Sequence, residues 1–157
     1  MRGKTKFLAV LQQALEAIRE PRFFENERGY QGELIAELKN RLKNAVFPGD
    51  PIVEQEHQKS MPSHGITIRP DLIIHIPFGR GVTERRGAGN FVAIELKRNK
   101  RDVKGAFCNL RKIKEKLNYP LTILIIVNSA DTCAHLCPDS IWPAPRKLSQ
   151  FEVESVA

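Results

Sequence analysis

Cysteine is scarce in this chain and long apolar runs are absent. The 157 residues include three cysteines, an odd number, which argues against a disulfide framework and favours a reducing compartment. No apolar run approaches the roughly 20 residues that a membrane span needs, and Phe7 to Leu11 is too short for a secretion signal. We therefore expect a cytoplasmic protein that has no membrane partner.

Several common catalytic signatures are also missing. The chain has no glycine-rich phosphate loop, nucleophile elbow or Cys–His catalytic arrangement. Cys133, His135 and Cys137 have the spacing C-x-H-x-C, which is not a standard structural zinc signature, and no fourth ligand stands nearby. We therefore do not predict a zinc site.

The composition is that of an ordinary globular protein with an excess of positive charge. Apolar residues make up 41% of the chain, too many for a disordered protein. The formal net charge is +7. A basic domain of this size commonly binds a polyanion such as nucleic acid, although charge alone is equally compatible with simple solubility.

Apolar periodicity predicts a layered α/β domain. Helical spacing covers three segments: Lys4 to Arg19, Glu27 to Ala45, and Arg101 to Asn118. Strand patterns cover four segments: Ile52 to Gln58, Ile68 to Ile76, Phe91 to Lys97, and Leu121 to Val127. The predicted order is helix, helix, strand, strand, strand, helix, strand, with a central mixed sheet flanked by helices.

We predict one domain over 1–157, with an N-terminal helix at 4–19, a core at about 26–127 and a C-terminal extension at 128–157. The glycine-rich stretch Gly79 to Gly89 is expected to be a hairpin loop between two strands. In the extension, Leu148 to Val156 could add an edge strand.

Two carboxylates are expected to meet on one face of this sheet. Side chains alternate between the two faces of a strand, so Glu95 and Lys97 share a face with Ala93, opposite Val92, Ile94 and Leu96. Asp71 likewise shares a face with Ile73 and His75. If the two strands pair across the hairpin loop, Asp71 can approach Glu95.

Such a pair of acids calls for a cation. Neighbouring carboxylates repel one another in a protein interior unless something neutralises them. Mg²⁺ typically takes one or two carboxylates together with water and phosphate oxygens. Lys97 adds a positive charge two residues after Glu95, where it could stabilise a phosphorane-like transition state or help to activate the attacking water.

Pro70-Asp71, followed after a loop by Glu95-Leu96-Lys97 at the end of an apolar strand, resembles the PD-(D/E)xK motif of the restriction-endonuclease-like nucleases. The resemblance covers about 26–127 and includes the element order. The motif alone is short, and its specificity comes from the predicted strands that carry both halves. A second Pro-Asp pair at Pro138-Asp139 is followed by no such strand.

The resemblance implies hydrolysis of a phosphodiester bond with Mg²⁺ or Mn²⁺ as the cofactor. Asp71 and Glu95 would bind the metal, with the carbonyl of Leu96 as a further ligand, and Lys97 would support the developing charge. DNA is favoured over RNA as the substrate. The resemblance is also compatible with a homodimer.

Many members of this family add an acid from the helix before the first strand. Glu27 precedes Leu34 by seven residues, about two helical turns, so it lies in line with the apolar stripe of its helix. Glu33 and Glu37 fall towards the side of Asn40, Arg41 and Asn44, which is expected to face solvent. We choose Glu27 and keep Glu37 as its rival; a first-turn glutamate favoured by the helix dipole remains the simpler alternative for Glu27.

Other polar residues on the predicted strands are weaker candidates for the site. Glu54 and Glu56 share a face of the first strand and could add a metal ligand, although an exposed edge strand is the better explanation for them. His75 shares the face of Asp71, but a histidine with a structural hydrogen-bond partner is the simpler interpretation.

Basic residues cluster after the Glu-Leu-Lys segment. We predict that five of them contact phosphates: Arg98, Lys100, Arg101, Lys104 and Arg111. The alternative is an ordinary solvated helix face.

The sequence thus favours a metal-dependent nuclease. Two other classes stay open: a catalytically silent module with the same fold that binds nucleic acid or protein, and a nuclease domain that acts only inside a larger complex. The intact set of Asp71, Glu95 and Lys97 argues against the silent module, because binding alone does not require clustered acids that face a phosphate.

Overall fold

The computed structural model describes residues 2–42, 47, 49–55, 67–77, 89–98, 103–127 and 133–136. The elements within these ranges, in chain order, are α1 (Arg2–Ala17), the short 3-10 helix η1 (Pro21–Phe24), α2 (Glu27–Leu42), β1 (Ile52–Gln55), β2 (Leu72–His75), β3 (Asn90–Arg98), α4 (Val103–Leu117), β4 (Leu121–Val127) and β5 (Cys133–Leu136). This combination of helices and strands confirms the general α/β class predicted from the sequence.

The strands form one mixed sheet with the order β1-β2-β3-β4-β5. β1, β2 and β3 pair antiparallel, β3 and β4 pair parallel, and β4 and β5 pair antiparallel. β4 is buried along its whole length, as expected for a central strand that is covered on both faces. The hairpin between β2 and β3 is closed by a 2.9 Å hydrogen bond from the Ile76 N–H to the Gly89 carbonyl.

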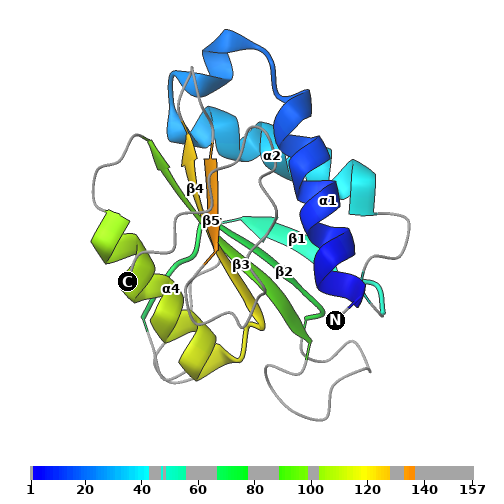
Figure 1. The fold of residues 1–157 in the computed structure, drawn as a ribbon, viewed down its shortest axis with the longest axis vertical. Helices are drawn as coiled ribbons and strands as arrows, with labels where there is room; N and C mark the ends of the chain where they lie inside the picture. Colours follow the sequence, from blue (N-terminus) through cyan, green and yellow to red (C-terminus); the bar gives the residue numbers. More distant parts are fainter. Residues whose placement is uncertain are drawn as a thin grey trace.

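Helices cover the two faces of the sheet, as Figure 1 shows for α4 on one side of the strands and α1 on the other. The larger core joins α1 and α2 to one face of the sheet, through residues such as Leu34, Leu38, Ile94 and Ile123. The residues that alternate with these in β3 and β4 pack against α4 on the opposite face; Ala93 and Leu124 are examples. Burial of these apolar faces is the main force that holds the layers together.

Local contacts define where the two helices beside β3 begin or end. At the start of α2, the Asn26 side chain caps the helix by accepting a 2.6 Å hydrogen bond from the Gly29 N–H. At the end of α4, Asn118 adopts a left-handed conformation with φ 56°, which is common just after a helix. The Asn90 amide then donates a 2.6 Å hydrogen bond to the carbonyl of Leu117, in the last turn of the helix. β3 therefore both precedes α4 in the chain and holds its last turn.

The structure also corrects some boundaries. The second strand is shorter than the predicted Ile68 to Ile76: β2 is Leu72–His75, and Ile68 forms only an isolated bridge. Pro70 lies between them and has no N–H to donate to a sheet ladder. η1 and β5 were not predicted. The predicted edge strand at 148–156 lies outside the described residues.

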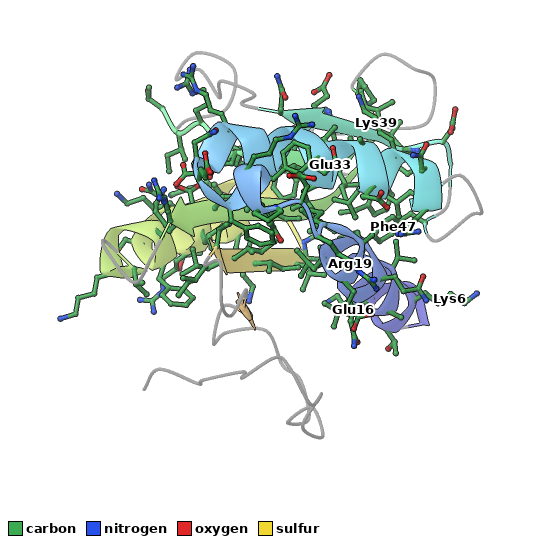
Figure 2. All side chains as sticks on the ribbon, turned by 90° about the horizontal axis from the view of Figure 1, so that it is seen from above. Lys6, Glu16, Arg19, Glu33, Lys39 and Phe47 are labelled. Atoms are coloured by element: carbon green, nitrogen blue, oxygen red, sulfur yellow. The ribbon has the colours of Figure 1, made fainter. Side chains whose placement is uncertain are left out.

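Aromatic packing fastens α1 to the sheet. The ring of Phe47, labelled in Figure 2, lies 5.5 Å from the Phe7 ring of α1 and 4.7 Å from the Phe91 ring of β3, measured between centroids. On its outer side, α1 presents exposed polar side chains such as Lys6 and Glu16 (Figure 2). In the part of the chain that the structure describes, no helix combines the length and apolar character needed to cross a membrane.

Candidate active site

Asp71 and Glu95 meet where β2 begins and β3 ends. Leu72 of β2 pairs with Ile94 of β3, so Asp71 lies at the next position along, beside Glu95. Oδ2 of Asp71 accepts a 2.6 Å hydrogen bond from the N–H of Leu96. Because β2 begins at Leu72, no residue of that strand lies opposite Leu96. The Asp71 carboxylate occupies that place in the ladder and is held against the Glu95-Leu96-Lys97 segment.

Glu95 and Lys97 form an ion pair on the α4 face of the sheet. Nζ of Lys97 lies 3.0 Å from Oε1 of Glu95. Ala93, which shares this face, packs against Ile113 and Leu117 of α4. The Glu95 side chain is buried, with 6% of the residue exposed. Its other oxygen, Oε2, is also buried and has no hydrogen-bond partner among the described residues.

Burial and the neighbouring carboxylates oppose the ionisation of Glu95. Burial, followed by the charge of Asp71, raises the pKa of Glu95 from 4.5 to about 7, although Lys97 acts in the opposite direction. Burial alone would lower the pKa of Lys97, but the charges of Glu95, Asp71 and Glu27 together raise it. The charge of Lys97 thus interacts with three carboxylates, those of Glu95, Asp71 and Glu27.

Glu27, at the first position of α2, reaches the end of β3. Its Oε2 accepts a 3.2 Å hydrogen bond from the N–H of Arg98. Its charge contributes to the pKa shifts of both Glu95 and Lys97. The helix acid chosen from the sequence therefore lies close to the Asp71–Glu95 pair.

The other two glutamates of α2 point elsewhere. Glu37 forms a 2.8 Å ion pair with Arg41, one turn further along the same helix. Glu33 is partly exposed (Figure 2). Neither contributes to the shifted pKa of Glu95 or of Lys97. The arrangement favours Glu27 over Glu37 as the helix acid.

Sequence reasoning missed one residue beside this site, Gln31. Its side chain is buried, with 4% of the residue exposed, and its amide donates a hydrogen bond to the main-chain carbonyl of Asp71. A polar residue within the apolar stripe of α2, four residues after Glu27, was the signal that could have found it.

The structure describes three of the five residues predicted to contact phosphates. Arg98 ends β3 and is exposed, and Lys104 and Arg111 lie exposed on α4. Lys104 and Arg111 are two helical turns apart and so lie on one side of that helix. Lys100 and Arg101 are outside the described residues.

His75 and Glu54 form a separate pair nearer the β1 edge of the sheet. Nε2 of His75 lies 2.8 Å from Oε2 of Glu54. Burial and the charge of Glu54 also raise the pKa of Tyr119. This pairing agrees with the structural interpretation of His75, and it engages Glu54 away from Asp71 and Glu95. Glu56 lies outside the described residues.

The donor set at the candidate site consists of two carboxylates. Within the described ranges, no group of three or more His, Cys, Asp and Glu side chains has an arrangement that could hold a metal ion. Asp71 and Glu95 nevertheless suit Mg²⁺, which needs only one or two carboxylates from a protein. Oε2 of Glu95, which is buried and has no hydrogen-bond partner among the described residues, is an atom that such a cation would satisfy. Burial is the main cause of the raised Glu95 pKa, and a cation there would offset the contribution that comes from the charge of Asp71.

Comparison with known proteins adds no assignment to this geometry. No protein-family model matches the chain, and no curated protein or solved structure matches it significantly.

Proposed function

We propose that this protein is a metal-dependent nuclease that hydrolyses phosphodiester bonds, with DNA favoured over RNA, and that its core has the restriction-endonuclease-like fold. The observation that carries the proposal is the joining of Asp71 and Glu95, 24 positions apart in the chain, through the 2.6 Å hydrogen bond from Leu96 to Asp71. The motif pair that resembles PD-(D/E)xK in sequence is thus one cluster in space.

Two features support Mg²⁺ or Mn²⁺ as the cofactor. Glu95 keeps one buried oxygen without a hydrogen-bond partner among the described residues, and burial, followed by the charge of Asp71, raises its pKa to about 7. Asp71 and Glu95 would hold the cation, together with the main-chain carbonyl of Leu96. Bound there, the cation would supply Lewis acidity for the attack of water on phosphorus.

The residues of the chain have distinct tasks in this proposal. The Leu96 N–H orients the Asp71 carboxylate towards the end of β3. Lys97, whose pKa is raised, stays protonated at neutral pH and would stabilise negative charge on the phosphate as it develops. Glu27, which accepts a hydrogen bond from the Arg98 N–H, would position a water molecule or add a negative charge that helps to balance the charge of the cation. Exposed Lys104 and Arg111 would contact the nucleic-acid backbone.

The proposal is tested by incubating purified protein with plasmid and with single-stranded DNA, in Mg²⁺ or Mn²⁺, beside Asp71→Asn. Asp50→Asn is the matched control, because Asp50 is exposed and lies outside the cluster. We expect cleavage by the wild type and by Asp50→Asn, and loss of cleavage in Asp71→Asn. Equal cleavage by all three proteins would contradict the proposed site.

The same assay separates the alternative class. If the wild type cleaves neither DNA nor RNA but still binds nucleic acid, the catalytically silent module becomes the better account. The buried Glu95–Lys97 pair argues against that outcome, because a buried carboxylate with a raised pKa is costly to maintain and contributes nothing to phosphate binding.

A further inference from the structure

Gln31 is an anomaly on the buried side of α2. The other buried residues of this helix are Tyr30, Leu34, Ile35 and Leu38, and Gln31 lies among them with 4% of its surface exposed. Burying a primary amide is costly unless its hydrogen-bonding groups are satisfied. An apolar side chain would pack at this position without that cost, so the polar group requires an explanation.

The Gln31 amide contacts the residue that carries the first acid of the site. Its Nε2 donates to the main-chain carbonyl of Asp71, 40 positions later in the chain. Because β2 begins only at Leu72, this carbonyl precedes the regular ladder between β2 and β3. Gln31 supplies a donor at the point where the sheet stops.

Asp71 is thereby held at two points. The Gln31 amide holds its main chain, and the Leu96 N–H holds its carboxylate. Gln31 also follows Glu27 by one helical turn, and Glu27 contacts the Arg98 N–H. The first two turns of α2 therefore contact both chain segments that bear the acids.

We propose that Gln31 is a positioning residue, which holds the Asp71 carboxylate in place for a divalent cation by anchoring the Asp71 main chain to α2. This inference rests on the proposed function. Groups that orient a metal ligand commonly change metal affinity or activity by about 10- to 100-fold when they are removed. If Gln31 had only a structural role, replacing it would change the stability of the protein but would leave the position of the Asp71 carboxylate and its affinity for a cation unaltered.

The test uses Gln31→Met, which keeps an unbranched side chain of similar length and removes the amide. Gln12→Met is the matched control, because the Gln12 amide donates on a helix surface to Glu16, away from the site. If Gln31→Met folds poorly, Gln31→Leu takes its place. The first readout is hydrogen exchange of the Leu96 amide, compared with that of Ile123 in the neighbouring strand, in metal-free protein.

We expect Gln31→Met to lose protection at Leu96 in excess of any loss at Ile123. The second readout is Mn²⁺ binding by calorimetry, where we expect the dissociation constant to rise by about 10-fold or more. Gln12→Met should match the wild type in both readouts. Unchanged relative protection at Leu96, or unchanged Mn²⁺ affinity, would overturn the positioning role.

Failure of this proposal is distinguishable from failure of the proposed function. If the wild type binds Mn²⁺ and Gln31→Met binds it equally well, only the role of Gln31 is wrong. If the wild type itself binds no Mn²⁺ and cleaves no nucleic acid, the proposed function is wrong and the role of Gln31 falls with it.

Discussion

The N–H of Leu96 donates a 2.6 Å hydrogen bond to Oδ2 of Asp71. Leu96 stands between Glu95 and Lys97, and its own side chain is buried on the opposite face of β3 among the residues that pack against α1 and α2. Core packing of Leu96 and positioning of Asp71 are therefore linked through a single peptide group. This link explains how a strand whose apolar side chains are buried in the core can also support an acidic cluster at its end.

The two rival helix acids can be separated by a matched pair of substitutions. We expect Glu27→Gln to reduce metal-dependent cleavage by about 10- to 100-fold. The reason is that Glu27 contacts the end of β3 and that its charge contributes to the raised pKa of both Glu95 and Lys97. Glu37→Gln should leave cleavage unchanged, since Glu37 pairs with Arg41 instead. Single-turnover cleavage rates decide between them. A larger loss in Glu37→Gln would reverse our choice.

Lys97 should affect the chemical step more than nucleic-acid binding. We expect Lys97→Ala to lower the cleavage rate by about 100-fold or more, because a positive charge beside the reacting phosphate is removed. DNA affinity should change little, since the side chain is only partly exposed and already pairs with Glu95. The control is Lys6→Ala, on the outer side of α1 (Figure 2). Cleavage within about threefold of wild type in Lys97→Ala would contradict this role.

The raised pKa of Glu95 predicts how stability depends on pH in metal-free protein. Burial and the charge of Asp71 raise this pKa from 4.5 to about 7. Between these values the folded state binds a proton that the unfolded state has released, so the free energy of unfolding falls as the pH rises through the window. The loss attributable to Glu95 is about 3 kcal/mol.

Urea unfolding at pH 5 and pH 8 in a chelator measures this effect. Glu95→Gln should lack this part of the pH dependence and should be more stable than the wild type at pH 8, while losing cleavage. Glu16→Gln, which changes an exposed glutamate of α1, should behave as the wild type does. An identical pH dependence in the wild type and Glu95→Gln would show that Glu95 ionises normally.

The exposed basic residues of α4 should contribute to binding through phosphates. Each phosphate contact that is lost lowers the slope of log affinity against log salt by about 1. We expect Lys104→Ala and Arg111→Ala each to flatten the slope by about that amount, across unrelated DNA sequences. Lys39→Ala on α2, an exposed lysine labelled in Figure 2, is the control. Unchanged slopes would indicate that this side of α4 faces only solvent.

Much of the site could be predicted because β3 combines a clear alternation with polar residues at its end. Alternation predicted the shared face of Glu95 and Lys97, and the α/β class followed from the apolar periods. The hydrogen bond between Leu96 and Asp71 could not be predicted, because it depends on the register of β2 against β3 and on the position at which β2 starts. Periodicity determines facing but not register.

Other features escaped prediction for different physical reasons. The role of Gln31 could not be predicted, because its hydrogen-bond partner, the carbonyl of Asp71, is 40 residues away in the chain. η1 is a single short turn after Pro21, and such turns carry no apolar period. β5 is a four-residue strand beside β4, too short for an alternation pattern to distinguish it from a loop.

The central claim is that Asp71 and Glu95 together hold a divalent cation, and calorimetric titration of Mn²⁺ into the purified protein tests it most directly. We predict one binding event per chain in the wild type and in Asp50→Asn, and its loss in both Asp71→Asn and Glu95→Gln. Binding heats that are the same in all four proteins, or absent from the wild type, would contradict the claim.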